Sequence, residues 1–299
     1  MEAENNKTGK IFNIQRFSIY DGPGIRTVVF FAGCNLNCAW CHNPESISSK
    51  EQLKFNSDQC ILCGRCARSC EKKAHMIDKG LHIFDRDKCG LCLKCAKECY
   101  AEALVPVWRE MTAAELEKSI LTDEQYFSQS GGGVTFSGGE PMLQAGFLRE
   151  ILGACKSLGI HTAVDTAGAV GFGAFEKILP FCDLFLYDIK AYDSAVHKKL
   201  TGMPNGLILE NLAELSKRSK VRVRVPAVAG ANGNIGEMAG IAGFLGGIKI
   251  NQCELLPYHR LGEGKYGSLG MANENAFDEP GESMMNDIRE IFKKGNIQC

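Results

Sequence analysis

The chain has 299 residues, and its 34 Lys and Arg residues nearly balance 35 Asp and Glu residues, which gives a formal net charge of −1. This balance argues against a nucleic-acid-binding protein held by bulk positive charge. A hydrophobic fraction of 45% and a charged fraction of 23% are typical of soluble globular proteins and exclude disorder as the dominant state. The start carries no apolar signal segment, and no apolar stretch approaches the ~18 residues of a membrane span, so we expect a cytoplasmic protein without a membrane partner.

The first expected strand is the apolar run RTVVFFA at 26–32, which leads directly into a group of cysteines. Residues 51–105 then change character, because they hold eight cysteines with short spacers and a unit that repeats itself. This self-similarity predicts an insertion with its own architecture. After it, MTAAELEKSIL predicts a helix, with Thr112 and Glu115 spaced as a capping box.

From residue 133 onwards, apolar strands alternate with amphipathic helices, which predicts parallel βαβ units with right-handed crossovers. The expected strands are GGGVTFSG, IHTAVDTAG, DLFLYDIK, KVRVRVPAV and KINQCELLPYH. The expected helices surround FLREILGACKSLG, FEKILP, LILENLAELSKRS, GEMAGIAGFLGG and MMNDIREIFKKG. With residues 26–32 this makes six strands, which favours a partial barrel or an open sheet over a complete eight-fold barrel. In either case, ligands gather at the carboxyl ends of the strands.

Cysteine usage is the anomaly of the composition: there are 15 cysteines, and 11 of them fall between Cys34 and Cys99. The odd count and the spacings favour reduced, metal-bound thiols over disulfides. Cys34, Cys38 and Cys41 have the spacing C-x3-C-x2-C. A 4Fe-4S cluster normally takes four cysteines, so three would leave one iron open for chemistry. From spacing alone two alternatives remain, a zinc site with His42 as fourth ligand and a redox pair of Cys38 and Cys41.

Two later runs share the spacing C-x2-C-x2-C-x3-C, which resembles the two-cluster bacterial ferredoxins. In that arrangement the fourth cysteine of each run ligates the other cluster. The implied ligand sets are Cys60, Cys63, Cys66 and Cys99 for one cluster, and Cys89, Cys92, Cys95 and Cys70 for the other. Glu71 and Tyr100 stand where those ferredoxins usually carry proline. We expect this module to relay electrons from a flavodoxin or ferredoxin towards the first cluster, and a purely structural module is the alternative.

The segment IFNIQRFSIYDGPGIRTVVFFAGCNLNCAWCHNPES resembles the opening of the glycyl-radical-enzyme activating enzymes, a branch of the radical S-adenosylmethionine (SAM) superfamily. The resemblance implies an α/β fold, a partial (β/α)6 barrel of the radical SAM type with an inserted ferredoxin-like module. Residues 1–50 would form the first part of the barrel with the cluster loop, 51–105 the insert and 106–299 the rest of the barrel.

The same resemblance implies three 4Fe-4S clusters, of which the one at Cys34, Cys38 and Cys41 binds SAM through its open iron. Reduction would cleave SAM to methionine and a 5′-deoxyadenosyl radical, which takes a hydrogen atom from a backbone glycine of a partner glycyl radical enzyme. This chemistry is typical of anaerobic metabolism.

The lining of the SAM site is also implied by the resemblance. The expected lining residues are Trp40, Cys41, His42, Gly138, Gly139, Glu140, Asp165, Asp188, Ile189, Lys190, Arg224 and His259. The two aspartates could also hold a monovalent cation. Taken alone, these features have ordinary explanations: a Gly-Gly turn serves as a tight βα connection, an Asp after a strand as a helix N-cap, and a lone His as a satisfied surface or core residue.

Two other functions fit parts of the sequence. A radical SAM enzyme acting on a small molecule would carry nearly the same pocket motifs, and a multi-cluster electron carrier would carry the same cysteine runs. The opening YDGPGIRT combined with the ferredoxin-type insert favours an activating enzyme, whereas the long βα scaffold argues against a mere carrier. The remaining cysteines lack ligand spacing, so Cys155, Cys182 and Cys253 are expected in the core and Cys299 as a free terminal thiol. Without a coiled-coil pattern we expect a monomer.

Overall fold

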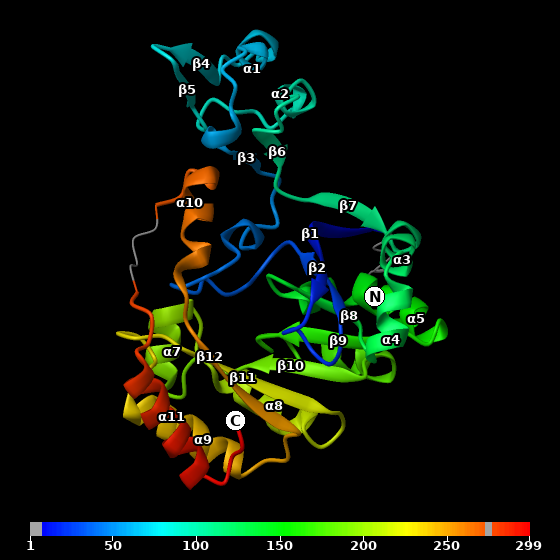
Figure 1. The fold of residues 1–299 in the computed structure, drawn as a ribbon, viewed down its shortest axis with the longest axis vertical. Coiled ribbons are helices and arrows are strands. Elements are labelled where there is room, and N and C mark those ends of the chain that lie inside the picture. The colour runs from blue at the N-terminus through cyan, green and yellow to red at the C-terminus, as the bar shows by residue number, and fades with distance from the viewer. Residues whose placement is uncertain (1–7, 273–276) are drawn as a thin grey trace.

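The computed structural model describes residues 8–272 and 277–299, and its body is built on one open eight-stranded sheet (Figure 1). The strand order is β12-β11-β10-β9-β8-β2-β1-β7. Six adjacent strands run parallel, and they are the six that the sequence predicted: β2 (Arg26–Phe31), β8 (Gly133–Gly138), β9 (His161–Thr166), β10 (Leu184–Asp188), β11 (Val221–Ala227) and β12 (Gln252–Pro257). The expected partial (β/α)6 barrel is therefore confirmed.

Two antiparallel strands extend the sheet beyond the prediction. β1 (Thr8–Ser18) pairs with β2, and β7 (Arg109–Thr112) pairs with β1. Both strands lie at the margin of the sheet, where one face is partly open to solvent. They mix polar and apolar residues, so they lack the continuous apolar run that marks a buried parallel strand.

Helices connect the parallel strands and cover the sheet. Their bounds are α3 (Ala113–Leu121), α4 (Glu124–Ser130), α5 (Ala145–Ser157), α6 (Gly173–Ile178), α7 (Ser194–Thr201), α8 (Gly206–Leu215), α9 (Ile235–Gly246), α10 (Gly264–Leu269) and α11 (Glu282–Lys294). Short 3-10 turns are η1 (Pro44–Ser46), η2 (Ser57–Gln59), η3 (Pro141–Gln144), η4 (Leu179–Phe181) and η5 (Arg260–Gly262). The expected capping box starts α3, because the Glu115 amide donates to Thr112 Oγ1 (3.2 Å) and the Thr112 amide donates to Glu115 Oε2 (2.8 Å).

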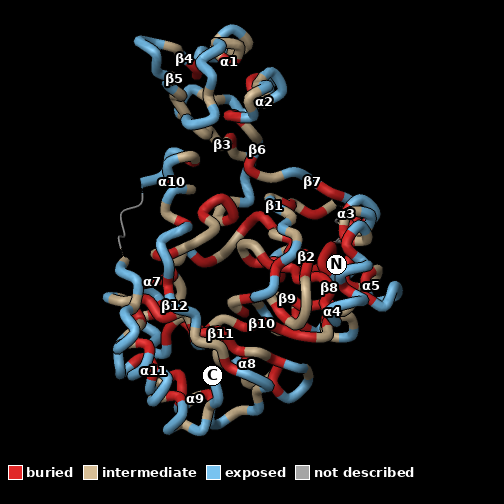
Figure 2. The backbone as a smooth tube through the Cα atoms, viewed as in Figure 1, coloured by how far each residue is buried: buried red, intermediate tan, exposed pale blue. Residues whose placement is uncertain are grey.

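The main core lies between the sheet and these helices, and Figure 2 shows the buried residues concentrated there. Cys155, Cys182 and Cys253 are buried, as expected. Cys299 is a free thiol, as expected, and its side chain is hydrogen-bonded to that of Cys253. Among the described residues no helix is long and apolar enough to cross a membrane.

The cysteine-rich segment stands apart from the sheet at one end of the molecule (Figure 1). Its elements are β3 (Leu53–Phe55), α1 (Arg65–Ser69), β4 (His75–Asp78), β5 (Leu81–Phe84), α2 (Lys94–Lys97) and β6 (Leu104–Pro106). β3 and β6 pair antiparallel where the chain enters and leaves the segment. Arg86 ties the segment to the body, because its guanidinium donates to Leu53 O (2.6 Å) and to Ser268 O in α10 (2.7 Å).

Candidate active site

The first cysteine group lies on the loop that follows β2, at the carboxyl end of that strand. Backbone hydrogen bonds hold the loop from two sides. The Cys34 amide donates to Ile47 O (3.2 Å), and the Ala39 amide donates to Leu200 O near the end of α7 (2.9 Å). The loop therefore sits over the edge of the sheet at which ligands are expected.

The three thiols of this loop converge. Burial raises the pKa of Cys34 to about 12 and those of Cys38 and Cys41 to about 11, and each thiol also feels the charge of a neighbouring one. The Leu36 amide donates to Cys34 Sγ (3.4 Å). Thiols this buried are protonated unless a metal binds them as thiolates, so the donor set fits a soft metal or an iron–sulfur cluster.

His42 follows the third cysteine but contacts the end of β12. Its Nε2 lies 2.9 Å from His259 O, and its ring stacks on the His259 ring with 4.3 Å between the centroids. It also stacks on Tyr258, at 5.4 Å. The zinc alternative with His42 as fourth ligand therefore loses its support. Trp40 is buried against Leu200 and Tyr258, so its ring anchors the loop.

The Gly-Gly turn after β8 requires glycine for physical reasons. Gly138 has a positive φ of 121°, and a Cβ at position 139 would lie 2.3 Å from Gly33 O. The Glu140 amide donates to Gly33 O (2.9 Å), which joins this turn to the cysteine loop.

The Glu140 carboxylate is a buried brace between β8 and β9. It accepts hydrogen bonds from Thr166 Oγ1 (2.7 Å), from the Ala167 amide (3.0 Å) and from the Met142 amide (3.1 Å). Burial raises its pKa to about 7, although these donors act in the opposite direction. Its side chain therefore positions the turn, with both oxygens already bonded within the protein.

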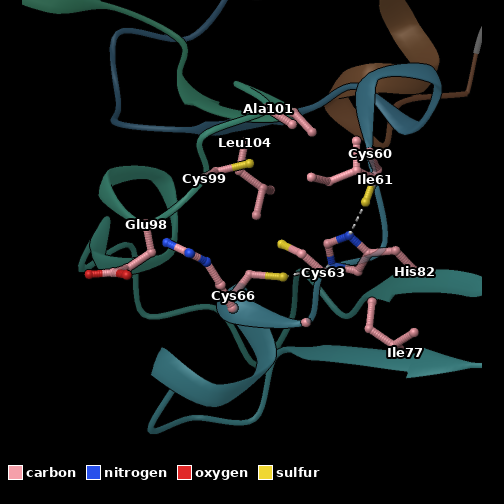
Figure 3. Close-up of a pocket in the computed structure, with 13 residues that line it drawn as sticks. Cys60, Ile61, Cys63, Cys66, Ile77, His82, Glu98, Cys99, Ala101 and Leu104 are labelled. Carbon is pink, nitrogen blue, oxygen red and sulfur yellow. Dashed lines mark hydrogen bonds between the residues drawn. The ribbon is translucent and has the colours of Figure 1, made fainter.

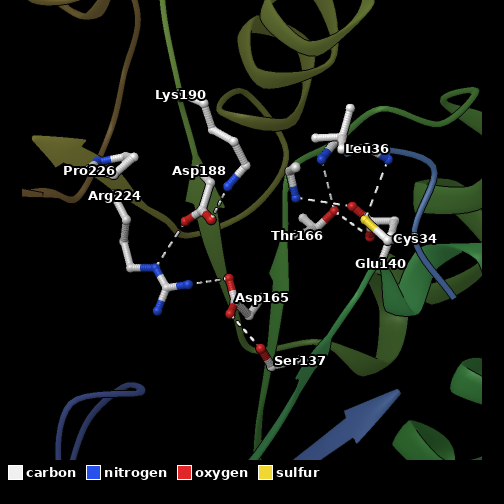
Figure 4. A network of polar contacts seen from close by, with 12 residues as sticks. Cys34, Leu36, Ser137, Glu140, Asp165, Thr166, Asp188, Lys190, Arg224 and Pro226 are labelled. Atoms are coloured by element: carbon white, nitrogen blue, oxygen red, sulfur yellow. Dashed lines mark hydrogen bonds and ion pairs between the residues drawn. The ribbon is translucent and has the colours of Figure 1, made fainter. Parts of the chain in front are cut away.

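A network of charged side chains connects β9, β10 and β11, the next three strands of the sheet (Figure 4). Arg224 of β11 forms ion pairs with Asp165 of β9 and with Asp188 of β10, with 3.1 Å from Arg224 Nε to Asp188 Oδ1. Lys190 Nζ donates to Asp188 Oδ2 (2.8 Å), and Ser137 Oγ donates to Asp165 Oδ2 (2.6 Å). The structure thus brings together the acidic and basic residues that the sequence placed on separate strands.

The two carboxyl groups respond differently to this environment. Burial raises the pKa of Asp165. Burial alone would also raise that of Asp188, but Lys190 and Arg224 outweigh it and the pKa ends below its usual value. The same carboxylates raise the pKa of Lys190 and of Arg224 despite burial, so both cations keep their charge. Lys190 is also close enough to the Cys38 thiol to favour its ionised form.

Some of the expected site residues already have partners within the protein. Ile189 is 1% exposed and packs in the main core, and its amide donates to Arg224 O (3.0 Å), so it continues the strand pairing. Both Asp165 and Asp188 already pair with Arg224, so a monovalent cation would have to share their oxygens with the guanidinium.

Sequence reasoning missed several residues of this site. Tyr266 OH donates to Cys41 O (3.0 Å), and Lys265 Nζ donates to His42 O (2.9 Å), which ties the cysteine loop to α10. Asp21, in the loop between β1 and β2, has an Oδ1 atom 3.7 Å from Arg224 Nη1. The signal for Asp21 was its place in the motif YDGPGIRT, whereas nothing local marks Lys265 or Tyr266.

In the insert, the cysteines gather in the crossed sets rather than by run. One pocket is lined by Cys60, Cys63, Cys66 and Cys99 together with His82 (Figure 3). In the second group, burial and the nearby thiols of Cys89 and Cys70 raise the pKa of Cys95 to about 11. Cys99 therefore lies with the thiols of the first run, and Cys70 lies near Cys89 and Cys95 of the second.

Comparisons with known proteins agree with this geometry. Residues 28–244 match the Radical SAM superfamily. The chain is 41% identical to a trans-4-hydroxy-L-proline dehydratase activating enzyme of Clostridioides difficile, over 96% of this chain and 97% of that protein. It is 41% identical to a choline trimethylamine-lyase activating enzyme of Oleidesulfovibrio alaskensis, over 87% of this chain and 86% of that protein.

Among solved structures, a radical SAM methyltransferase from Sphaerobacter thermophilus covers 97% of this chain and 75% of its own, with a TM-score of 0.55 and 13% identity. That likeness concerns the fold. Fold, cysteine loop and relatives agree, and the chain belongs to the radical SAM superfamily, in its branch of glycyl-radical-enzyme activating enzymes.

Proposed function

We propose that this chain activates a partner glycyl radical enzyme by reductive cleavage of SAM, and that the resulting 5′-deoxyadenosyl radical takes a hydrogen atom from a backbone glycine of the partner. The observation that carries the proposal is the juxtaposition of three converging thiols with the Asp165–Asp188–Arg224 network at the carboxyl ends of parallel strands. A 4Fe-4S cluster bound there would supply the electron and the open iron.

The chain's own side chains would hold the two ends of SAM. Lys190 and Arg224 keep their positive charge and suit its carboxylate, although both are shared with buried aspartates. The stacked rings of His42 and His259 offer an aromatic surface for the adenine. Glu140 would act indirectly by holding the Gly138 turn beside the cysteine loop.

A protein substrate is supported by the surface beside this site. The sheet is open between its outer strands β12 and β7 in the described part of the chain. The loop next to Asp21 exposes apolar side chains, with Ile19 60% and Tyr20 83% accessible. Exposed apolar groups beside a reactive centre suit the docking of a protein segment. A small-molecule substrate is the alternative.

The test is transfer of the radical to a protein. We would incubate the anaerobically reconstituted, reduced chain with SAM and each of the enzymes activated by its relatives, and record the glycyl radical signal. Ile19→Asp is expected to reduce that signal while 5′-deoxyadenosine formation persists. Ile235→Asp, at a position 71% exposed on α9, is the matched control and is expected to leave both unchanged. Equal signals from both variants would refute docking at this loop, and no protein radical with any partner would favour a small-molecule substrate.

We also propose that the insert holds two 4Fe-4S clusters and passes electrons from a flavodoxin or ferredoxin to the SAM-binding cluster. The crossed gathering of its thiols supports this, and so does the exposure of Ile61 (69%) and Leu62 (40%) beside Cys60 and Cys63. Cys63→Ser is expected to slow SAM cleavage with flavodoxin as donor but not with a small chemical reductant. Equal loss with both donors would contradict a relay.

Three smaller assignments complete the proposal. The protein acts in the cytoplasm. It is a monomer, and size-exclusion chromatography tests this oligomeric state. A monovalent cation shares the Asp165 and Asp188 oxygens with Arg224 when SAM is bound. SAM affinity is then higher in potassium than in tetramethylammonium salts, and equal affinity would remove the cation from the account.

A further inference from the structure

Two histidines of the insert lie against one of its cysteine sets. His82 Nδ1 is 3.4 Å from Cys60 Sγ, and His82 Nε2 is 3.6 Å from Cys66 Sγ. The imidazole stands among the thiols that line the pocket (Figure 3). Phe55 packs edge-on against it, with 4.4 Å between the ring centroids, and so restricts its orientation.

His75 supports His82 from the other side. It is 4% exposed, its ring stacks on Phe84 at 4.5 Å, and its Nδ1 lies 3.1 Å from His82 Nε2. The hydrogen bond between these two ring nitrogens needs one of them to accept, and the ring that accepts is neutral. Each neutral ring has one N–H and one acceptor nitrogen.

The proton positions follow from His75 Nε2, which is buried and has no hydrogen-bond partner among the residues that the structure describes. A buried N–H without an acceptor is rare, so Nε2 is the unprotonated nitrogen and His75 carries its proton on Nδ1. Nδ1–H then donates to His82 Nε2. His82 therefore carries its own proton on Nδ1, which faces Cys60 Sγ.

The other half of the insert has no such donor at the corresponding place. His82 is paired with Ile77, seven residues after Cys70, in the β4–β5 hairpin. In the repeat, Pro106 lies seven residues after Cys99 and is paired with Leu53. Leu53 thus takes the position of His82, and Leu104 likewise takes that of His75.

We propose that His82 donates its Nδ1–H to the Cys60 thiolate and thereby raises the reduction potential of the cluster held by Cys60, Cys63, Cys66 and Cys99 above that of the neighbouring cluster. The inference rests on the two-cluster insert proposed above. Reduction adds negative charge to a cluster and its sulfur ligands, so an N–H donor to sulfur favours the reduced state. His75 is a positioning residue that fixes the tautomer of His82. Two clusters with similar cysteine spacing thus have unequal reduction potentials, and the electron resides preferentially on the cluster beside His82.

The test is a redox titration of the full-length, reconstituted chain, followed by electron paramagnetic resonance. His82→Leu copies the residue of the other half and is expected to shift one insert cluster to a lower potential while the other stays unchanged. His82→Gln, which keeps an N–H donor, is expected to recover part of the shift. His75→Leu is expected to give a smaller shift in the same direction. Met76→Leu, on an exposed side chain of β4, is the control and is expected to change nothing.

Iron and sulfide contents separate failure of the inference from failure of the two-cluster proposal. Iron for three clusters with unchanged potentials in His82→Leu would refute the donor role and leave the proposed function intact. The two-cluster insert itself would be refuted if the wild type held iron for one cluster only. It would also be refuted if the insert bound zinc through Cys66, His75 and His82, whose ligand atoms lie within 4.8 Å of one another. Loss of one cluster in both His82 variants would make His82 a ligand and refute the donor role. If only His82→Leu loses iron, the reduction potential of His75→Leu tests the donor role instead. A shift to lower potential supports that role, and an unchanged potential refutes it.

Discussion

Replacing Arg224 by methionine tests how the charged network is held together. The guanidinium is the shared partner of Asp165 and Asp188, and Arg224 is only 9% exposed. Its removal deletes two charge-assisted hydrogen bonds, each of which contributes about 1.5–3 kcal/mol. The sum agrees with the cost of about 3–5 kcal/mol for removing one member of a buried ion pair. Asp188 keeps Lys190, and Asp165, whose pKa burial already raises, can take up a proton, so we expect a loss of about 3 kcal/mol.

The assay is urea unfolding of the reconstituted protein without oxygen, together with SAM binding. Arg222→Met is the matched control, because Arg222 lies two residues earlier on β11 and pairs with Glu254 (3.0 Å), at 21% side-chain exposure. It is expected to lose about 1 kcal/mol and to keep SAM affinity. A loss below about 1 kcal/mol in Arg224→Met, with SAM binding retained, would refute the reasoning.

Three further changes probe the scaffold. Burial raises the pKa of Glu140 from 4.5 to about 7, so the folded state holds this proton more tightly than the unfolded state. The protonated Glu140 therefore contributes its full stabilisation below about pH 4.5, and this stabilisation is lost as the pH rises from about 4.5 to 7. Glu140→Gln is expected to flatten this part of the pH dependence of unfolding, and an unaltered slope would contradict the assignment. Thr112→Ala removes the capping box of α3 and is expected to cost about 1 kcal/mol, measured by urea unfolding against Thr8→Ala. Gly168→Ala places a Cβ at positive φ and 1.7 Å from the Tyr187 hydroxyl, so a loss of about 2 kcal/mol or more is expected, and wild-type stability would show that the turn relaxes freely.

Much of the fold could be predicted because its parallel strands are buried on both faces. Val28 and Val29 in β2, and Val223 and Val225 in β11, are all 0% exposed, and such strands appear as apolar runs. The carboxyl ends of parallel strands meet at one edge, so Asp165, Asp188 and Arg224 could be expected together from the sequence.

The rest depended on contacts between residues distant in the sequence. Lys265 reaches the cysteine loop from a position 223 residues later, and no local pattern announces such a contact. Arg26 is 0% exposed within an apolar strand, where its guanidinium donates to Val134 O and to Thr135 Oγ1. The bond between His75 and His82 depends on the β4–β5 hairpin, whose short strands carry too few residues for a clear alternation.

The central claim is that Cys34, Cys38 and Cys41 hold the cluster that cleaves SAM. The most direct measurement is the yield of 5′-deoxyadenosine from SAM after anaerobic reconstitution and reduction, for the wild type, Cys38→Ala and Cys155→Ala. Cys155 is a buried thiol of the main core, it belongs to none of the cysteine motifs, and it serves as the control. The account predicts product from the wild type and from Cys155→Ala, and none from Cys38→Ala. Product from Cys38→Ala at the wild-type rate, or no product from a wild type loaded with iron for all its clusters, would contradict it.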